Sequence, residues 1–212
     1  FAGQNGSGFI DTSNDKFNVT IETEDQCGSI TYSDNAEFHA LIINNSCKVY
    51  KYNNEYLTID GVGNMFGRGG DFSSNNKYIA TRSRQGRIDS NNFPGVPTLY
   101  DLTKKKEVLL DYADLPDAIK ENGIATVKFI NEKSVFLLAH WDGYITFWDA
   151  ESGGYLSYIK GHDAWVSEIV FSPDGNKFYS CAADQSIKIW NFNDKKLVAT
   201  LTGHRNEVWA IA

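Results

Sequence analysis

The chain has 212 residues, a formal net charge of −7, and 13 Phe, 11 Tyr and 5 Trp beside only 4 Pro. An acidic chain without a run of Lys and Arg lacks the clustered cations that contact phosphates, so we expect no direct binding of nucleic acid. No apolar run approaches the roughly 20 residues that a membrane-spanning helix needs, so we expect no membrane partner. The abundance of aromatic residues favours many short strands over disorder.

The three cysteines, Cys27, Cys47 and Cys181, are widely spaced and odd in number. They lack the density of a disulfide scaffold and the close pairing of a zinc site. We therefore expect buried free thiols in a reducing, intracellular compartment, which means the cytoplasm, the nucleus or both.

Five short closing motifs divide the chain at nearly regular intervals. In chain order they are Phe9-Ile10-Asp11, Val49-Tyr50-Lys51, Leu99-Tyr100-Asp101, Phe147-Trp148-Asp149 and Ile189-Trp190-Asn191. The central residues of successive motifs are 40, 50, 48 and 42 positions apart. A period of about 40–50 residues with an aromatic residue and Asp at its end is typical of four-stranded propeller blades.

Polar turns that lead into apolar strands recur with the same period. They begin after Tyr32, Phe72, Phe129 and Phe171, and the last of them reads Ser172-Pro173-Asp174-Gly175. The turn after Phe72 aligns as one residue shorter than the turn after Phe171. Period-two alternation in the flanking segments predicts inner strands at Ile124–Phe129, Val166–Phe171 and Val208–Ile211.

These landmarks predict an all-β fold, a β-propeller of four-stranded antiparallel blades. The predicted division is the end of a truncated blade at 1–26, whole blades at 27–60, 61–111, 112–160 and 161–202, and the start of a truncated blade at 203–212. The blade at 61–111 carries a long insertion between two of its strands. Because the chain opens on Phe1 without Met and closes on Ala212 inside an apolar run, we expect a fragment of a longer protein.

The segment Gly161–Asn191 resembles a repeat of the WD-repeat β-propeller family. It has the Gly-His opening, the Ser-Pro-Asp-Gly turn, Asp184 and a closing Trp190, and Asp142-Gly143 before Trp148-Asp149 is a second good match. The resemblance implies a ring that usually has seven blades, of which this chain is an incomplete part. It also implies a structural hydrogen-bonded chain inside one blade, formed by His162, Ser180, Asp184 and Trp190.

A catalytic His–Asp pair is the alternative interpretation of His162 and Asp184. The recurrence of the pattern favours the structural role, because active sites occur once. The buried Trp indole needs an acceptor, which a Ser hydroxyl can provide. The other blades have Leu138, Thr81 and Ala40 where this blade has Ser180, so we expect them to be weaker.

A narrower similarity is to the WD-repeat subunit of superkiller complexes. The matching residues are Gly161–Val166, Phe171, Pro173-Asp174, Asp184–Ser186, Val208-Trp209 and Asp142–Ile145. That family holds partners in RNA-decay and transcription-elongation assemblies, and in some members in a meiotic complex. The similarity therefore implies a role of the same kind here.

No enzyme motif is present, so we predict no catalytic residues, no cofactor and no metal ligands. The glycine-rich stretch Gly61–Gly70 lacks the Gly-Lys-Ser/Thr of a phosphate loop and is interpreted as an inter-strand connection. The insertion Arg82–Pro97 is nine residues longer than its equivalent in the last blade. It is either a docking loop or a solvated loop.

The candidate partner-binding residues lie at strand entries and in inter-strand turns. They are Trp141, Trp165, Glu207, Arg82, Arg84, Arg87 and Phe93. The two tryptophans are either packing caps or a docking patch, and the three arginines of the insertion would steer an acidic partner.

The sequence thus predicts a non-enzymatic WD-repeat scaffold that binds several other proteins in a multiprotein complex. The alternative is a propeller domain of a larger enzyme or regulatory chain whose catalytic part lies outside this chain. Carboxylates or a metal in the central channel would favour the enzyme, and a bare channel would favour the scaffold.

Overall fold

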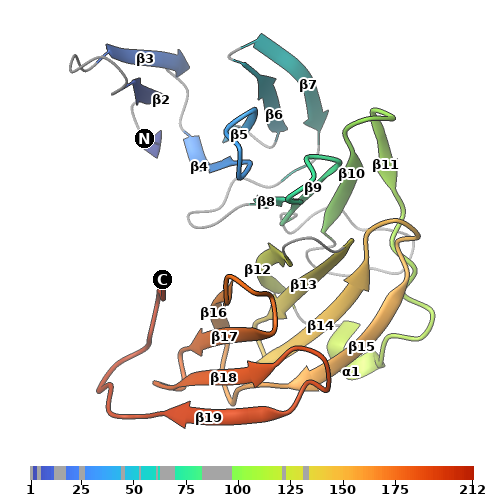
Figure 1. Ribbon diagram of the computed structural model, residues 1–212, viewed down its shortest axis with the longest axis vertical. Helices are drawn as coiled ribbons and strands as arrows, with labels where there is room; N and C mark the ends of the chain where they lie inside the picture. The colour runs from blue at the N-terminus through green and yellow to red at the C-terminus, as the bar shows by residue number, and fades with distance from the viewer. Residues whose placement is uncertain are drawn as a thin grey trace.

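The computed structural model consists almost entirely of antiparallel β-sheets (Figure 1). The structure describes residues 2–3, 6–11, 18–23, 27–43, 46–52, 54–60, 62, 70–82, 97–120, 123–130 and 134–212, with side chains from residue 29 onward. Within these ranges the one helix is α1, Asp117–Lys120. No helix in the described part of the chain is long and apolar enough to cross a membrane. The prediction of an all-β fold is confirmed.

Five sheets follow one another along the chain, each built from consecutive strands. The first contains β1 (Ala2–Gly3), β2 (Gly6–Asp11) and β3 (Asn18–Thr23). The second contains β4 (Cys27–Tyr32), β5 (Phe38–Ile43), β6 (Ser46–Lys51) and β7 (Asn54–Asp60). The third contains β8 (Gly70–Phe72), β9 (Tyr78–Thr81), β10 (Thr98–Asp101) and β11 (Lys106–Val108). The fourth contains β12 (Ile124–Phe129), β13 (Val135–His140), β14 (Tyr144–Asp149) and β15 (Tyr155–Lys160). The fifth contains β16 (Val166–Phe171), β17 (Lys177–Ala182), β18 (Ile187–Asn191) and β19 (Leu197–Leu201).

The sheets radiate from their first strands, as the blades of a propeller do. Strand β4 contacts β1 and β8, and β12 contacts β8 and β16, so the first strands lie side by side in chain order. Figure 1 shows the sheets fanning outward from these strands. The inner strands predicted at Ile124–Phe129 and Val166–Phe171 are confirmed as β12 and β16.

Neighbouring sheets pack face to face, which explains why the middle strands are apolar on both sides. One core cluster joins the fourth and fifth sheets through Leu137, Phe147 and Phe178, each at most 1% exposed. A second cluster joins the third and fourth sheets and includes Leu115 and Ile119, which α1 and the turn before it bring against β12–β15. Strands buried on both faces lose the simple alternation of a one-sided sheet.

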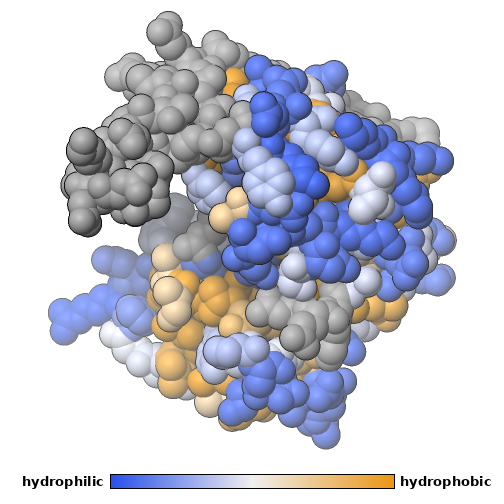
Figure 2. Space-filling view, turned by 45° about the horizontal axis from the view of Figure 1, so that its top comes forward, coloured by the Kyte–Doolittle hydropathy of each residue, from blue (hydrophilic) through white to orange (hydrophobic). Residues whose placement is uncertain are grey.

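The fifth sheet keeps one face partly open. Ile187 and Ile189 on β18 are partly exposed, whereas Ile145 and Phe147 at the equivalent positions of β14 are buried. On the face drawn in Figure 2, hydrophilic residues predominate, and the largest group of hydrophobic residues lies left of centre. The side chains of Cys47 and Cys181 are buried, as expected, and the side chain of Cys27 lies outside the described residues.

Three turns between first and second strands, those of the second, third and fifth sheets, share one geometry. A Ser hydroxyl accepts a hydrogen bond from the backbone N–H five residues later, in the pairs Ser33–Phe38 (3.0 Å), Ser73–Tyr78 (2.8 Å) and Ser172–Lys177 (2.9 Å). The fourth turn residue has a positive φ in each, 56° at Ala36, 57° at Asn76 and 64° at Gly175. The three turns therefore have equal length, and the prediction of a shorter turn after Phe72 is wrong. The sequences were aligned on Lys77 and Lys177, which occupy different turn positions.

The predicted inner strand Val208–Ile211 is also wrong, because the structure assigns no strand between residues 202 and 212. The segment still lies against the fifth sheet. Val208 N donates to Ala182 O at 3.1 Å, and Ile211 N donates to the Glu168 carboxylate at 3.1 Å. One backbone bond and a few side-chain bonds hold the segment in place, but a strand requires a regular ladder.

Candidate functional site

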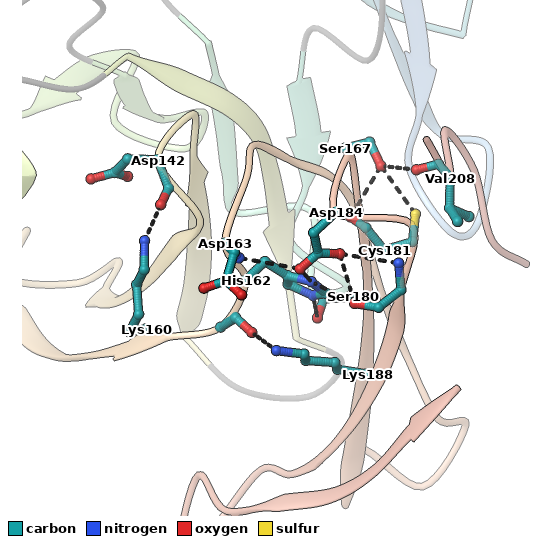
Figure 3. A network of polar contacts seen from close by, with 12 residues as sticks. Asp142, Lys160, His162, Asp163, Ser167, Ser180, Cys181, Asp184, Lys188 and Val208 are labelled. Carbon is teal, nitrogen blue, oxygen red and sulfur yellow. Dashed lines mark hydrogen bonds and ion pairs between the residues drawn. The ribbon is translucent and has the colours of Figure 1, made fainter. Parts of the chain in front are cut away.

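His162, Ser180, Asp184 and Trp190 form one hydrogen-bonded chain inside the fifth sheet (Figure 3 shows the first three). His162 Nδ1 lies 2.8 Å from Asp184 Oδ2, and His162 Nε2 lies 2.7 Å from Ser180 Oγ. Trp190 Nε1 donates to the same hydroxyl at 2.9 Å. Since a carboxylate only accepts, Nδ1 carries the proton, and Ser180 donates to the free lone pair of Nε2.

The local fold positions each member of this chain. His162 precedes β16, Ser180 and Trp190 lie on the paired strands β17 and β18, and Asp184 lies in the turn between these two strands. The Asp184 carboxylate also accepts hydrogen bonds from the Ser186 backbone N–H and hydroxyl at 3.0 and 2.6 Å. The network thus ties the turn to both strands and to the segment that enters the sheet.

Burial dominates the electrostatics of the pair. Burial lowers the pKa of His162, against the opposing effect of the Asp184 carboxylate. Burial raises the pKa of Asp184, but hydrogen bonds from Ser186, the Asp163 backbone and His162 together bring that pKa below its usual value. The neutral imidazole and the ionised carboxylate are therefore the stable forms near neutral pH.

The hydrogen-bonded order Ser180–His162–Asp184 is also that of a nucleophilic triad. Such a triad can act chemically only if a substrate can reach the Ser hydroxyl. Ser180 is 0% exposed and His162 is 1% exposed. The Ser180 hydroxyl also accepts the Trp190 indole proton. A substrate therefore has no access to the Ser180 hydroxyl in this structure, and the arrangement pairs buried polar groups with one another.

The fourth sheet has a network that the sequence comparison missed. Trp148 Nε1 donates to Thr146 Oγ1 at 2.8 Å, and His140 Nε2 lies 2.9 Å from the same oxygen. The acceptor stands two residues before the tryptophan on the same strand, while Leu138 occupies the position of Ser180. The Thr two residues before the Trp of the closing motif is the sequence feature that could have identified this acceptor. The lower stability expected of this blade stays a prediction. The lack of an acceptor for its indole cannot be the cause, because Thr146 is that acceptor.

Trp141 and Trp165 lie at the same end of two neighbouring blades. Trp141 N donates to Gly123 O, and Ala183 N donates to Trp165 O, both at 3.0 Å, so the two turns are built alike. The turn after Trp141 touches the segment before Trp165, because a Cβ on Gly143 would lie 2.9 Å from the backbone O of Ala164.

Sequence reasoning did not select a third tryptophan at this end. The rings of Trp165 and Trp209 are 4.8 Å apart at an interplanar angle of 72°. Trp209 is 66% exposed and Trp141 is 54% exposed, while Trp165 is partly exposed. We call Trp141, Trp165 and Trp209 the tryptophan rim. Glu207, a predicted site residue, is exposed on the segment that carries Trp209.

Arg82 makes a contact between two sheets. Its Nη1 donates to Ala125 O on β12 at 2.6 Å, the residue is partly buried, and burial lowers the pKa of its guanidinium. The side chain therefore joins the third sheet to the fourth, and the partner contact predicted for Arg82 stays a prediction. Arg84, Arg87 and Phe93 lie outside the described residues.

The first strands β4, β8, β12 and β16 line an open pocket of about 390 Å³, and Asp71, Lys128 and Glu168 are among its lining residues. Asp71 pairs with Lys128 at 3.0 Å and accepts the Phe129 N–H at 2.7 Å. Burial raises the pKa of Asp71, against the effect of the Lys128 charge. The Glu168 carboxylate accepts the backbone N–H of Ile211.

Among the described residues that line this pocket, the two carboxylates Asp71 and Glu168 each accept a hydrogen bond from a backbone N–H of the protein. Among the described residues, no three His, Cys, Asp or Glu side chains are grouped so that they could hold a metal ion.

Comparison with known proteins agrees with this geometry. Residues 153–191 match the family model described as WD domain, G-beta repeat. The chain is 38% identical over 81 residues to polyadenylation factor subunit 2 of Candida albicans, which covers 38% of this chain and 15% of that protein. It is 26% identical over 87 residues to nuclear distribution protein nudF of Aspergillus niger, covering 41% of this chain and 20% of nudF. It is 26% identical over 115 residues to human striatin-3, covering 54% of this chain and 14% of striatin-3.

The matched regions span a fifth or less of these three relatives. The family match covers β15 of the fourth sheet and β16–β18 of the fifth sheet, and it includes the four residues of the hydrogen-bonded chain. Four four-stranded antiparallel sheets that radiate from their first strands are the architecture of WD-repeat propellers. Residues 153–191 thus match a WD repeat, and the chain has the sheet architecture of the WD-repeat proteins to which it is similar.

Proposed function

We propose that the protein is a non-enzymatic scaffold that binds other proteins in a multiprotein complex through the tryptophan rim. WD repeats are typical of protein-interaction scaffolds. The observation that supports the site is the exposure of Trp141, at 54%, beside the partly exposed Trp165 of the neighbouring blade. Large indoles left in solvent at one end of the blades are unusual on a surface that serves no contact.

The physical basis of the proposal is the rigidity of the rim. Trp141 is held by its backbone bond to Gly123 O, and its ring lies over Gly123, where a Cβ would be 3.9 Å from the ring atoms. Trp165 is held by its bond to Ala183 and by its contact with Trp209. A fixed indole buries a large area on binding and loses little side-chain entropy, so each such residue contributes about 2 kcal/mol or more to a protein interface.

The test is recovery of partners from the native cell with the intact tagged protein. The rim variant carries Trp141→Ala and Trp165→Ala. The matched control is Tyr52→Ala, since Tyr52 is 68% exposed in the turn between β6 and β7, at the opposite end of the blades. Both variants must melt within a few degrees of the wild type before partners are compared.

We expect the rim variant to lose at least one partner that Tyr52→Ala retains. The proposal fails if the rim variant retains every partner while the Tyr52 variant loses them.

A second candidate is an enzyme with catalytic groups at the mouth of the central channel, which differs from a propeller domain of a larger enzyme or regulatory chain whose catalytic part lies elsewhere. The observation in its favour is the presence of Asp71 and Glu168 in the pocket lined by the first strands. Their hydrogen bonds to Lys128, Phe129 and Ile211 argue for a structural use. Loss of a co-purifying catalytic activity in a folded Asp71→Asn or Glu168→Gln variant, with all partners retained, would support the enzyme.

The finer assignments rest on the sequence. The scaffold proposal treats residues 27–60, 61–111, 112–160 and 161–202 as one blade each. The similarity to the superkiller-complex subunit would place the partners in RNA-decay or transcription-elongation assemblies, in the cytoplasm, the nucleus or both. Identification of the recovered partners by mass spectrometry tests this assignment.

A further inference from the structure

The outer edge of the fourth sheet exposes apolar side chains. Strand β15 is the last strand of this sheet, and among the described strands it pairs with β14 alone (Figure 1). On β15, Leu156 is 52% exposed and Tyr158 is 45% exposed. The inner strand of this sheet contacts the inner strands of the third and fifth sheets. The two side chains are therefore exposed although both neighbouring sheets are present.

The outer strands of the second and third sheets expose a different kind of side chain. The exposed residues are Asn54, Glu55, Thr58 and Asp60 on β7 and Lys106 on β11. Polar and charged residues on an edge strand disfavour its pairing with another chain. Strand β19 also exposes apolar residues, but its sheet has a described sheet on one side only. Only β15 thus combines an apolar edge with a neighbouring sheet on both sides.

Backbone groups on this edge point away from the sheet. Gly161 N donates to Gly143 O at 3.0 Å, so every second residue of β15, counted back from Gly161, directs its backbone groups toward β14. The N–H and C=O groups of Tyr158 and Lys160 therefore point outward. In the part of the chain that the structure describes, no backbone hydrogen bond joins either residue to a further segment.

The lysine on this edge does not protect it. Lys160 Nζ donates to the backbone O of Asp142 (Figure 3) and lies 4.6 Å from the centre of the Tyr144 ring. The Tyr144 ring in turn contacts the Tyr158 ring, with centroids 5.7 Å apart. The ammonium group is thus held at the end of the strand by contacts within the sheet.

The chain itself already pairs with the start of this edge. Asp111 N donates to Gly153 O at 2.9 Å, and Asp111 forms an isolated parallel bridge with Gly154. A Cβ on Gly153 would lie 2.1 Å from the backbone O of Leu109, which is itself 77% exposed. The segment turns after Tyr112, so the pairing stops where β15 begins. The edge therefore accepts a parallel strand, and the protein uses only its first positions.

Exposed carboxylates lie at the same end of the edge. Asp111 and Asp114 are both exposed. Burial raises the pKa of Tyr155, the first residue of β15, and the nearby charge of Asp114 adds to this effect. The third carboxylate of this segment, Asp117, pairs with Lys120 at 3.1 Å. Asp111 and Asp114 thus give this end of the edge a negative charge.

We propose that the outer edge of the fourth sheet binds an extended segment of a partner protein, which adds to β15 as a further parallel strand. The segment packs alternate apolar side chains against Leu156 and Tyr158, and it begins with Lys or Arg beside Asp111 and Asp114. Hydrogen bonds to the outward backbone groups of Tyr158 and Lys160 provide affinity, and the side chains provide specificity. The surface uses none of the tryptophan rim and goes beyond the proposed function.

The probe for this surface is a capped synthetic peptide in which two Lys precede an alternation of Val and Thr. Binding to the intact ¹⁵N-labelled protein is followed by NMR of the backbone amides and by their hydrogen exchange. One control peptide has the same side chains on an N-methylated backbone, which cannot donate hydrogen bonds. A second control peptide has Glu in place of Lys. The amides of Ser157 and Ile159 are internal controls, because they point toward β14.

We expect the amides of Tyr158 and Lys160 to shift saturably and to exchange at least about tenfold more slowly with the Lys peptide. The amides of Ser157 and Ile159 should change much less. The N-methylated peptide should not bind, and the Glu peptide should bind at least about threefold more weakly. Equal binding of the N-methylated peptide, or no protection of the two outward amides, would overturn the proposal.

Variants of the edge provide an independent test. Tyr158→Pro and Tyr158→Thr both remove the ring, but only Pro removes the outward N–H, at an edge position where Pro is tolerated. We expect Tyr158→Pro to lose the peptide and Tyr158→Thr to retain it, and equal binding to the two variants would refute pairing at β15. If Tyr158→Pro does not fold, the N-methylated peptide tests the same hydrogen bonds. Asp114→Asn should weaken binding of the Lys peptide by about threefold to tenfold, and an unchanged affinity would refute the basic end of the segment.

Discussion

Replacing Asp184 by Ala removes the carboxylate that orients the buried histidine. That carboxylate accepts four hydrogen bonds, from His162 Nδ1 at 2.8 Å, Asp163 N at 3.1 Å, Ser186 N at 3.0 Å and Ser186 Oγ at 2.6 Å. Water can replace the bond to exposed Asp163. The bond to His162 is different, because His162 is 1% exposed and would retain only a 3.2 Å contact with Ser186 Oγ.

The expected loss of stability in Asp184→Ala follows from the burial of His162. A buried donor left without its acceptor costs about 1–3 kcal/mol, which sets the expected loss in the free energy of unfolding. For a chain of this size each kcal/mol lowers the melting temperature by roughly 2–4 °C, so we expect a fall of about 2–12 °C. The loss should be seen equally in the urea midpoint at constant m-value.

The control is Asp163→Ala, which removes an exposed carboxylate one residue after His162 and keeps the backbone N–H that Asp184 accepts. We expect this variant to stay within about 0.5 kcal/mol of wild type, as surface substitutions usually do. Equal midpoints for the two variants would refute the structural role of the His162–Asp184 pair.

Three further predictions concern two buried histidines, a glycine turn and the acceptor of a buried indole. Burial lowers the pKa of both His162 and His39, so the stability they add is present above the unfolded value of about 6.5 and is lost as the pH falls toward the folded values. Urea midpoints should therefore fall between about pH 7.5 and about pH 5.5, and less so in His162→Gln; an equal fall in that variant would contradict the assignment. Gly143→Ala should cost about 3 kcal/mol or more, because a Cβ at its φ of 88° would lie 2.0 Å from a backbone oxygen. Gly175→Ala, at a φ of 64° and with its nearest contact at 3.9 Å, should cost only about 1–2 kcal/mol, and equal losses would exclude the clash. Thr146→Val should cost about 1–3 kcal/mol in thermal melts by removing the acceptor of a buried indole, and an unchanged melt would show that the indole is satisfied otherwise.

Features fixed by local hydrogen bonds could be predicted from the sequence. The closing Asp149 accepts the Ser152 N–H at 2.8 Å, and the Ser172 hydroxyl accepts the Lys177 N–H at 2.9 Å. Both bonds join residues at most five positions apart, so they leave a pattern that recurs with the blades. The same reasoning located β12 and β16, whose apolar residues follow the period of a strand.

Features that depend on distant residues could not be predicted. The hydrogen bond from Arg82 to Ala125 joins two sheets and links residues 43 positions apart, so no local sequence pattern predicts it. The segment after residue 202 has a sequence suited to a strand but makes one backbone bond to its neighbour, so strand propensity alone misled. The contact between the Trp165 and Trp209 rings likewise forms only because separate segments of the chain meet at one end of the fifth sheet.

The central claim is that partners bind at the tryptophan rim, and site-specific photo-cross-linking in the native cell tests it most directly. A photoreactive phenylalanine analogue is placed singly at Trp141, Trp165 or Trp209, and at Tyr52 on the opposite end of the blades as the matched site. The account predicts adducts with the same partner protein from at least two of the rim positions and none with it from Tyr52. Adducts from Tyr52 alone, with none from the rim in folded protein, would contradict it.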